Sequence, residues 1–178
     1  AAHAASDASG NGAGGGILTY LDSNGEAEAV GQFEFVTVGG NVASIGGAVE
    51  VETLTSSDTT GTEGLATLEI RNSILASNDS FGVGGPSPGS AGTLTSGGSG
   101  NLEFTLAYTN VSGNASGEIE TTVTPDSTVG NQIGIDALLD ADFVPGRCSP
   151  TIDAGDPADD FASEPADNGG RVNMGDLG

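Results

Sequence analysis

The sequence predicts an all-β chain that folds as a parallel β-helix, or β-solenoid, in which short strands stack as successive coils. Composition and an internal repeat of turn residues carry this prediction. The chain has 178 residues, 35% of them hydrophobic, with 31 Gly, no Trp, 2 Tyr and 6 Phe. This length suits one domain. Few bulky side chains and many small and β-branched ones favour short strands and tight turns over long helices.

The repeat is centred on asparagine. Asn11, Asn41, Asn78 and Asn114 recur in similar surroundings, at separations of 30, 37 and 36 residues. A β-rich run precedes each of the last three, and a Gly pair or triplet follows each of the first three. The runs span residues 32–38, 66–75 and 102–111. Such a unit cannot bury its apolar side alone, but units stacked in register can, which predicts a solenoid.

We expect the four asparagines to form a structural column at a corner of the coils. Asparagine tolerates left-handed backbone angles and can hydrogen-bond to its copy in the next coil. A row of ligand-binding side chains is the alternative. Within the runs, apolar residues such as Phe33 and Phe35 alternate with residues such as Glu34 and Glu69, so one strand face is expected to be apolar and the other acidic. A β-sandwich alternates in the same way, but it does not require asparagine and Gly pairs to return at this spacing.

The predicted organisation has two parts. Residues 1–142 form the coils, with a long low-complexity loop at 86–100, and residues 143–178 form a C-terminal cap. The chain starts inside a repeat unit, just before its first asparagine turn. We therefore expect the missing half coil to come from a longer parent chain or from a second copy.

Charge excludes several partners. There are 25 Asp plus Glu against 3 Lys plus Arg, and the formal net charge is −22. Nucleic acid and anionic membranes would be repelled, and no stretch approaches the roughly 20 apolar residues of a membrane span. We therefore predict neither nucleic-acid binding nor membrane insertion. A hydrated acidic surface and specific cation binding both remain open explanations of the charge.

Cysteine and the chain start bear on location. The single Cys148 excludes an internal disulfide and belongs to no zinc set; a buried inert thiol, an intermolecular disulfide and a reactive thiol stay open. Ala2, His3 and Ala4 have the small-x-small pattern of a signal-peptidase site. Either a leader was removed or a larger protein was cut. We expect a secreted protein, outside the cell or on its surface.

The C-terminal part carries the most specific motif, FVPGRCSPTIDAGDPADDFASEPADNGGRVNMGDLG at residues 143–178. It resembles the C-terminal end of bacterial right-handed β-helix repeat proteins, in which a G-SP-IDAGDP element precedes EP-PNGGRINMGAYG. RNSILASN, LAYTNVSGN and GNQIGIDALL extend the resemblance back to residue 66. The resemblance implies a right-handed helix closed by an irregular cap. Its fold-closing residues would be Asp153, Asp156, Asn168, Arg171 and Asn173.

Two uses are predicted for the charges of this cap. Arg171 stands among Asp153, Asp156 and Asp167 in the sequence, so a charge-assisted pair that locks the cap is expected. Asp153, Asp156, Asp159 and Asp160 supply the oxygen ligands that Ca²⁺ prefers, although their spacing matches no calcium loop. Calcium is the one cofactor that the sequence proposes.

No catalytic constellation is evident. Lyase chemistry on acidic sugars needs a base and cations, yet Lys is absent and only Arg71 lies in the predicted coils. Hydrolysis needs two carboxylates about 5 to 10 Å apart, and in so acidic a chain such pairs arise by chance. We therefore expect no enzyme, but an extracellular structural or adhesive protein that assembles head-to-tail into filaments. The alternative is a carbohydrate-binding module or a polysaccharide lyase or hydrolase, with polysaccharide as partner.

Overall fold

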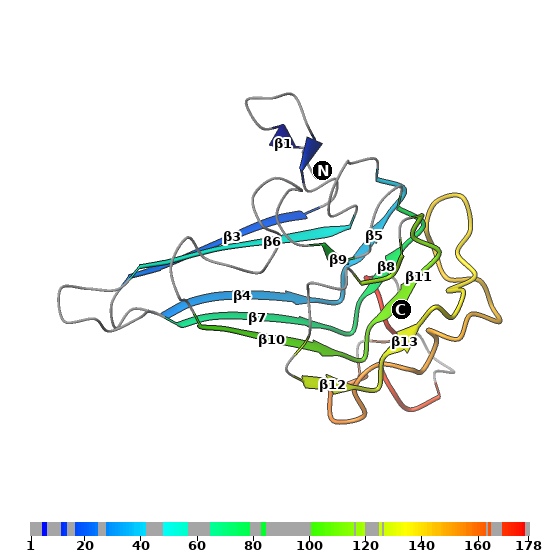
Figure 1. The fold of residues 1–178 in the computed structure, drawn as a ribbon. Helices are drawn as coiled ribbons and strands as arrows, with labels where there is room; N and C mark the ends of the chain where they lie inside the picture. The colour runs from blue at the N-terminus through cyan, green and yellow to red at the C-terminus, as the bar shows by residue number, and fades with distance from the viewer. Residues whose placement is uncertain are drawn as a thin grey trace.

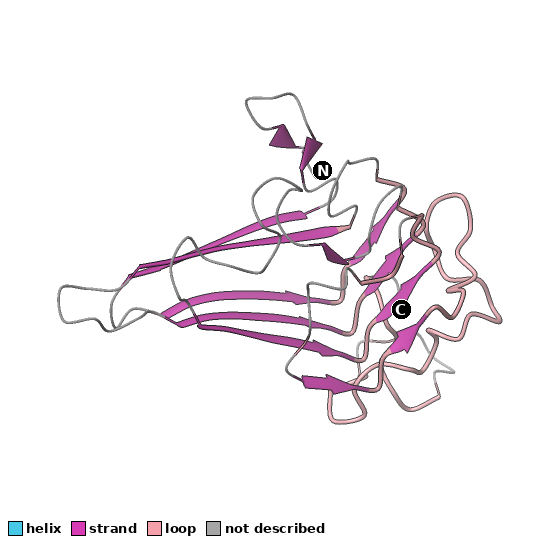
Figure 2. Cartoon of the chain, viewed as in Figure 1, coloured by secondary structure: helices cyan, strands magenta, loops and turns pink. Residues whose placement is uncertain are grey.

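The computed structural model is all-β, and its described part contains strands, turns and bends without a helix (Figure 1; Figure 2). The structure describes residues 5–6, 12–13, 17–24, 28–41, 48–56, 65–78, 83–84, 101–115, 117–119, 125, 127–162, 164 and 169–176. Asn11, Asp167, Asn168 and the predicted loop 86–100 lie outside these ranges. Within them, no helix is long and apolar enough to cross a membrane.

Three parallel sheets contain the strands from β3 onward. The first sheet consists of β3 (Ile17–Asn24), β6 (Val49–Ser56) and β9 (Val83–Gly84). The second consists of β4 (Glu28–Glu34), β7 (Leu65–Arg71), β10 (Asn101–Ala107) and β12 (Ser127–Val129). The third consists of β5 (Thr37–Gly39), β8 (Ile74–Ala76), β11 (Asn110–Ser112) and β13 (Gln132–Ile133). The short strands β1 (Ala5–Ser6) and β2 (Gly12–Ala13) form a separate antiparallel pair.

The chain visits the three sheets in a fixed order. It passes through β3, β4 and β5, then β6, β7 and β8, then β9, β10 and β11, and finally β12 and β13. Each strand lies parallel to the strand one round later, as Figure 1 shows for β4, β7 and β10. The prediction of an all-β chain with parallel strands is confirmed. The cyclic order is compatible with a β-solenoid.

A sharp corner divides each predicted β-run into two strands. The first corner follows the second sheet, and its first residue has a left-handed backbone: φ is 53° at Phe35, 48° at Asn72 and 45° at Tyr108. Each run therefore contributes to two sheets, so the expectation of a single strand with Phe33 and Phe35 on one face is wrong. Alternation continues only as far as the backbone stays extended.

The second corner follows the third sheet and contains the repeated asparagines. The left-handed residue here is the one before each asparagine: Gly40, Ser77 and Gly113. None of Asn41, Asn78 and Asn114 is itself left-handed. The expected left-handed backbone at the asparagines themselves is therefore wrong, whereas the expected hydrogen bond from each asparagine to its copy in the next coil is confirmed for Asn41, Asn78 and Asn114.

The core lies between the sheets and consists of rows that cross the coils. One row contains Phe33, Ile70 and Leu106, and another contains Val38, Leu75 and Val111. The middle members of both rows are fully buried. Burying such a side chain stabilises the fold by about 1.5–3 kcal/mol. A coil in the middle of the stack gains this on both of its sides, which is why the units depend on their neighbours.

The C-terminal segment, defined here as the described residues within 134–176 (134–162, 164 and 169–176), follows β13 and is irregular. Its only bridge among the described residues is the antiparallel pair of Leu139 and Pro145. Met174 and Ala137 bury Ile74 and Ala76, whose side chains point away from the core row of Leu75. The segment also reaches the first round, where the backbone amide of Asp176 donates to Thr37 Oγ1 at 3.3 Å. It thus covers the outer face of the third sheet along its length, rather than only the end of the stack.

Two glycines allow the packing of Tyr108 on the next round to be tested. Gly130 and Gly134 both have left-handed backbones, with φ of 65° and 69°. A Cβ on Gly130 would collide with the Tyr108 ring, whereas a Cβ on Gly134 would meet nothing within 4 Å. We expect Gly130→Ala to lower the free energy of unfolding by about 1 kcal/mol more than Gly134→Ala, because only the first adds overpacking to the backbone strain. Urea denaturation of the two variants measures this; equal losses would contradict it.

Candidate functional site

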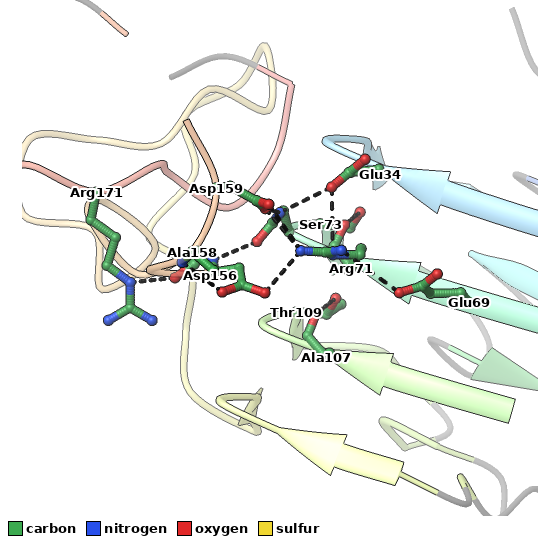
Figure 3. Close-up of polar contacts among 12 residues, drawn as sticks. Glu34, Glu69, Arg71, Ser73, Ala107, Thr109, Asp156, Ala158, Asp159 and Arg171 are labelled. Atoms are coloured by element: carbon green, nitrogen blue, oxygen red, sulfur yellow. Dashed lines mark hydrogen bonds and ion pairs between the residues drawn. The ribbon is translucent and has the colours of Figure 1, made fainter. Parts of the chain in front are cut away.

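The best-defined polar site is built around Arg71, the last residue of β7. Its guanidinium lies on the outer side of the second sheet and is surrounded by four carboxylates (Figure 3). Asp156 and Asp159 come from the C-terminal segment, with Oδ2 atoms at 2.8 and 3.0 Å from Arg71 Nη2. Glu34 of β4 has Oε1 at 3.4 Å from Nε, and Glu69 of β7, the strand of Arg71 itself, has Oε1 at 3.9 Å from Nη1. The site therefore joins two coils to the C-terminal segment.

Burial and charge act in opposite directions on this arginine. The Arg71 side chain is 26% exposed. Burial lowers its pKa, but Asp159, Glu34, Asp156 and Glu69 together raise the pKa by more, so the net shift is upward. The guanidinium is thus held in its charged form, and its ionic contacts are directed inward to residues of the same chain.

Asn72 completes the site from the first corner. Its side chain is fully buried. Its Oδ1 accepts from the backbone amide of Asp156 at 2.7 Å, and its Nδ2 donates to Asp159 Oδ2 at 2.5 Å. Its backbone carbonyl accepts from the amide of Gly175 at 2.8 Å. One corner residue therefore binds two separate stretches of the C-terminal segment, which fixes this segment against the coils.

Arg171 makes no ion pair with Asp153 or Asp156, and the third predicted partner, Asp167, lies outside the described residues. It donates to the backbone carbonyls of Gly155 and Ala154 and lies over the Tyr108 ring, 5.5 Å from the centroid. None of the carboxylates that the structure describes pairs with it, and Figure 3 shows Arg171 apart from the Arg71 group. The expected pair with Asp153 or Asp156 is wrong because folding brings Arg71 to Asp156 across 85 residues of sequence.

The remaining predicted cap residues form a local network. Asp153 Oδ1 accepts from the amide of Gly169 at 2.8 Å, and Asn173 Oδ1 accepts from the amide of Asp153 at 2.6 Å. Asn173 Nδ2 in turn donates to Glu164 Oε2 at 3.0 Å. These contacts hold the irregular backbone of the C-terminal segment in place and satisfy backbone groups that are not paired between strands.

The four aspartates predicted to bind calcium do not form one cluster. Asp156 and Asp159 face Arg71, Asp153 accepts from Gly169, and Asp160 Oδ1 accepts from the amide of Ala162 at 2.9 Å. Among the described residues, no three His, Cys, Asp or Glu side chains are grouped so that they could hold a metal ion. The predicted calcium site is therefore not formed by these residues, because Asp156 and Asp159 share Arg71 while Asp153 and Asp160 accept from separate backbone amides.

The repeated asparagines form a hydrogen-bonded ladder at the second corner. Asn78 Oδ1 accepts from the backbone amide of Asn41 at 3.1 Å and from its Nδ2 at 2.9 Å. Asn114 Oδ1 accepts from the same two groups of Asn78, at 3.1 and 2.8 Å. The Nδ2 of Asn78 also donates to the carbonyls of Val38 and Ala76. Each amide therefore satisfies backbone groups that the corner removes from the strand ladders.

Two sets of hydrogen bonds at the corners were not predicted from the sequence. Glu118 ends the asparagine ladder, because its carboxylate accepts from Asn114 Nδ2 at 2.7 Å and from the amide of Gly113 at 3.0 Å. A second ladder at the first corner uses Ser73 and Asn131, which accept from the amides of Val36 and Thr109 at 3.3 and 3.0 Å. The short hydrogen-bonding side chains right after the left-handed residues were the signal for this ladder.

A hollow of about 460 Å³ lies between the second corner and the C-terminal segment. Glu118, Asp136, Asp140 and Phe143 are among its lining residues. Asp136 and Asp140 each accept from a backbone amide two residues further on, at 2.8 and 2.9 Å, and Glu118 ends the ladder. These carboxylates thus stabilise local turns.

Cys148 is exposed, so of the three alternatives for its thiol the buried, inert one is wrong.

The contacts of Arg71, Asn72 and the corner asparagines join neighbouring rounds and satisfy backbone groups. No model of a known protein family matches the chain, and neither do curated proteins or solved structures.

Proposed function

We propose that this protein is a right-handed parallel β-helix that acts as an extracellular structural or adhesive element. The observation that supports this most directly is the use of charge at the Arg71 corner. One arginine, one asparagine and four carboxylates are engaged with each other, and they tie the C-terminal segment to two coils. Such a site stabilises the position of the C-terminal segment on the coils.

The cyclic order of three parallel sheets supports the helical part of the proposal. Parallel strands of one sheet are joined by right-handed connections in about 98% of cases. The resemblance of residues 143–178 to the ends of right-handed β-helices points to the same hand. A stack of this kind gives a stiff surface whose length grows with the number of coils.

Catalysis on acidic sugars has less support. Such a reaction needs a cation to neutralise the substrate carboxylate, and the cation of the coils, Arg71, already faces four carboxylates of its own chain. The carboxylates of the hollow likewise have backbone partners. A role in structure uses these residues as they stand.

The proposed location is testable through the exposed thiol of Cys148. Intact cells that produce the protein would be treated with a membrane-impermeant maleimide, and the chain would then be isolated and analysed by mass spectrometry. We expect Cys148 to be labelled before lysis, with a Cys148→Ser variant as the control for specific labelling. Labelling that occurs only after lysis would place the protein inside the cell and overturn the proposed function.

A further inference from the structure

The last round of the stack has open strand edges. Within the described residues, β12 pairs only with β10, and β13 pairs only with β11. Their other edges carry backbone N–H and C=O groups that no described strand pairs with. An edge of this kind is a template for a strand of another chain.

The core is also partly uncovered at this end. Ile133 continues the row of Val38, Leu75 and Val111. Leu75 and Val111 are fully buried, whereas Ile133 is 45% exposed. A cavity of about 380 Å³, lined by Leu106, Ile119 and Ile133 among others, opens beside it. A core row therefore ends in contact with solvent, at the place where another coil would cover it.

This end of an acidic molecule lacks charge. Residues 127–135, STVGNQIGI, contain no charged side chain, although the chain has 25 Asp plus Glu. Val129 and Ile135 are each 49% exposed. Natural proteins protect open edges with charged side chains, prolines or bulges, because these prevent pairing with other chains. Charge, the protection that this sequence has in abundance, is missing at this edge.

The opposite end of the stack has a matching shape. β4 and β5 also pair on one side only among the described residues, with β7 and β8. The core residues Ala29 and Phe33 are only partly buried there. Two corner residues separate β4 from β5, and two separate β12 from β13, so both ends present one strand of the second sheet and one of the third. The first-round end also presents β3, which pairs only with β6 among the described strands.

We propose that the β12–β13 end binds the β4–β5 end of a second copy of this chain, so that copies stack head-to-tail. The contact would extend the parallel ladders of the second and third sheets and would cover Ile133 with the partly exposed core of the first round. Because the two surfaces differ, the contact does not close on itself and produces an open filament. This inference rests on the coil architecture of the proposed function and identifies its partner.

Salt should control the assembly. Each copy carries a formal charge of −22, so copies repel at low ionic strength. The screening length falls from about 10 Å at 0.1 M salt to about 3 Å at 1 M. β12 and β13 carry no charged side chain to pair with Glu28 and Glu34 of β4, so salt weakens the repulsion without weakening an ionic contact between the two ends.

Sedimentation velocity in 0.05 M and 1 M NaCl tests the proposal. We expect the wild-type chain to associate in 1 M NaCl, and Ile133→Lys to raise the dissociation constant at least tenfold. Ile152→Lys is the matched control, because Ile152 is 36% exposed on the C-terminal segment, and it should associate like the wild type. Circular dichroism and urea midpoints verify that both variants fold. A wild-type chain that stays monomeric in 1 M NaCl, or equal association of all three, would overturn the proposal.

Mixing experiments distinguish head-to-tail contacts from contacts between two like ends. Ala29→Lys places a charge at the β4–β5 end and leaves the β12–β13 end intact. Alone, neither Ala29→Lys nor Ile133→Lys should associate, but their mixture should form dimers that grow no further. Dimers of Ala29→Lys by itself would indicate tail-to-tail pairing and refute the head-to-tail arrangement. The labelling of Cys148 does not depend on assembly, so each proposal can fail separately.

Discussion

Replacing Arg71 with glutamine is expected to lower the free energy of unfolding by about 2–3 kcal/mol. This is somewhat less than the 3–5 kcal/mol lost when a fully buried pair is broken, because water partly screens the site. The change leaves Glu34, Glu69, Asp156 and Asp159 facing each other without their shared cation. The C-terminal segment should then detach more readily, since two of these carboxylates belong to it.

Arg147→Gln is the matched control for this change. It removes the same charge from an exposed residue that has no ion pair with any carboxylate in the described ranges. Its effect should stay within about 0.5 kcal/mol. Urea denaturation measures both variants, and limited proteolysis with subtilisin should cut residues 134–176 faster in Arg71→Gln alone. If both variants lose the same stability, the Arg71 site does not fasten the segment.

The pKa of Arg71 determines how the stability difference between wild type and Arg71→Gln changes at high pH. A group whose pKa is raised by folding contributes stability that is fully present below its unfolded pKa and is lost as pH rises through the folded value. Folding raises the pKa of a group that is already strongly basic. The stability from Arg71 is therefore lost only at a pH above the range in which unfolding is measured. The difference between wild type and Arg71→Gln should therefore be the same at pH 7 and pH 10. A difference that shrinks by pH 10 would contradict the upward shift.

Replacing Asn78 with alanine is expected to cost about 4 kcal/mol, the largest effect of any substitution considered, because it leaves several buried groups without partners. Asn78 is 2% exposed. Its loss removes the acceptor of the Asn41 amide and the Nδ2 donor to Asn114 Oδ1, Val38 and Ala76. Both neighbouring rounds are affected, so unfolding should remain cooperative but shift to lower urea concentration.

Asn41→Ala provides the comparison within the same ladder. Asn41 is the first described member, is only partly buried and donates to one neighbouring round. Its replacement should cost about 1 kcal/mol, the value of a typical hydrogen bond. Urea denaturation of both variants gives the ratio. An equal loss of stability in the two variants would mean that the hydrogen bonds of Asn78 to both neighbouring rounds stabilise the fold no more than those of Asn41 to one.

The stacking of strands could be predicted because it is encoded at short and regular spacing. Asn41, Asn78 and Asn114 are 37 and 36 residues apart, and the structure places them in hydrogen-bonding contact on successive rounds. The corners at Phe35, Asn72 and Tyr108 could not be predicted in this way. Three different residue types adopt the same left-handed backbone there, and alternation alone does not show where an extended run bends.

The position of the C-terminal segment depended on the path of the chain. Ile74 and Ala76 are apolar residues on the outer face of the third sheet. In the sequence, the apolar run of residues 74–76 is indistinguishable from an ordinary core strand. Only the folded chain shows that Met174 and Ala137 cover this face. The predicted cap therefore lies along the side of the stack, because that is where the uncovered apolar surface is.

The sequence by itself determined an all-β chain with parallel strands and a strongly acidic character, since both follow from local composition and a regular repeat. Tertiary structure alone decided which charges meet. Arg71 rather than Arg171 binds Asp156, across 85 residues, and Asp159 joins them. Neighbours in sequence predict a contact only when the backbone between them is regular, and residues 134–176 are irregular. Their partners are set by the surface on which they pack.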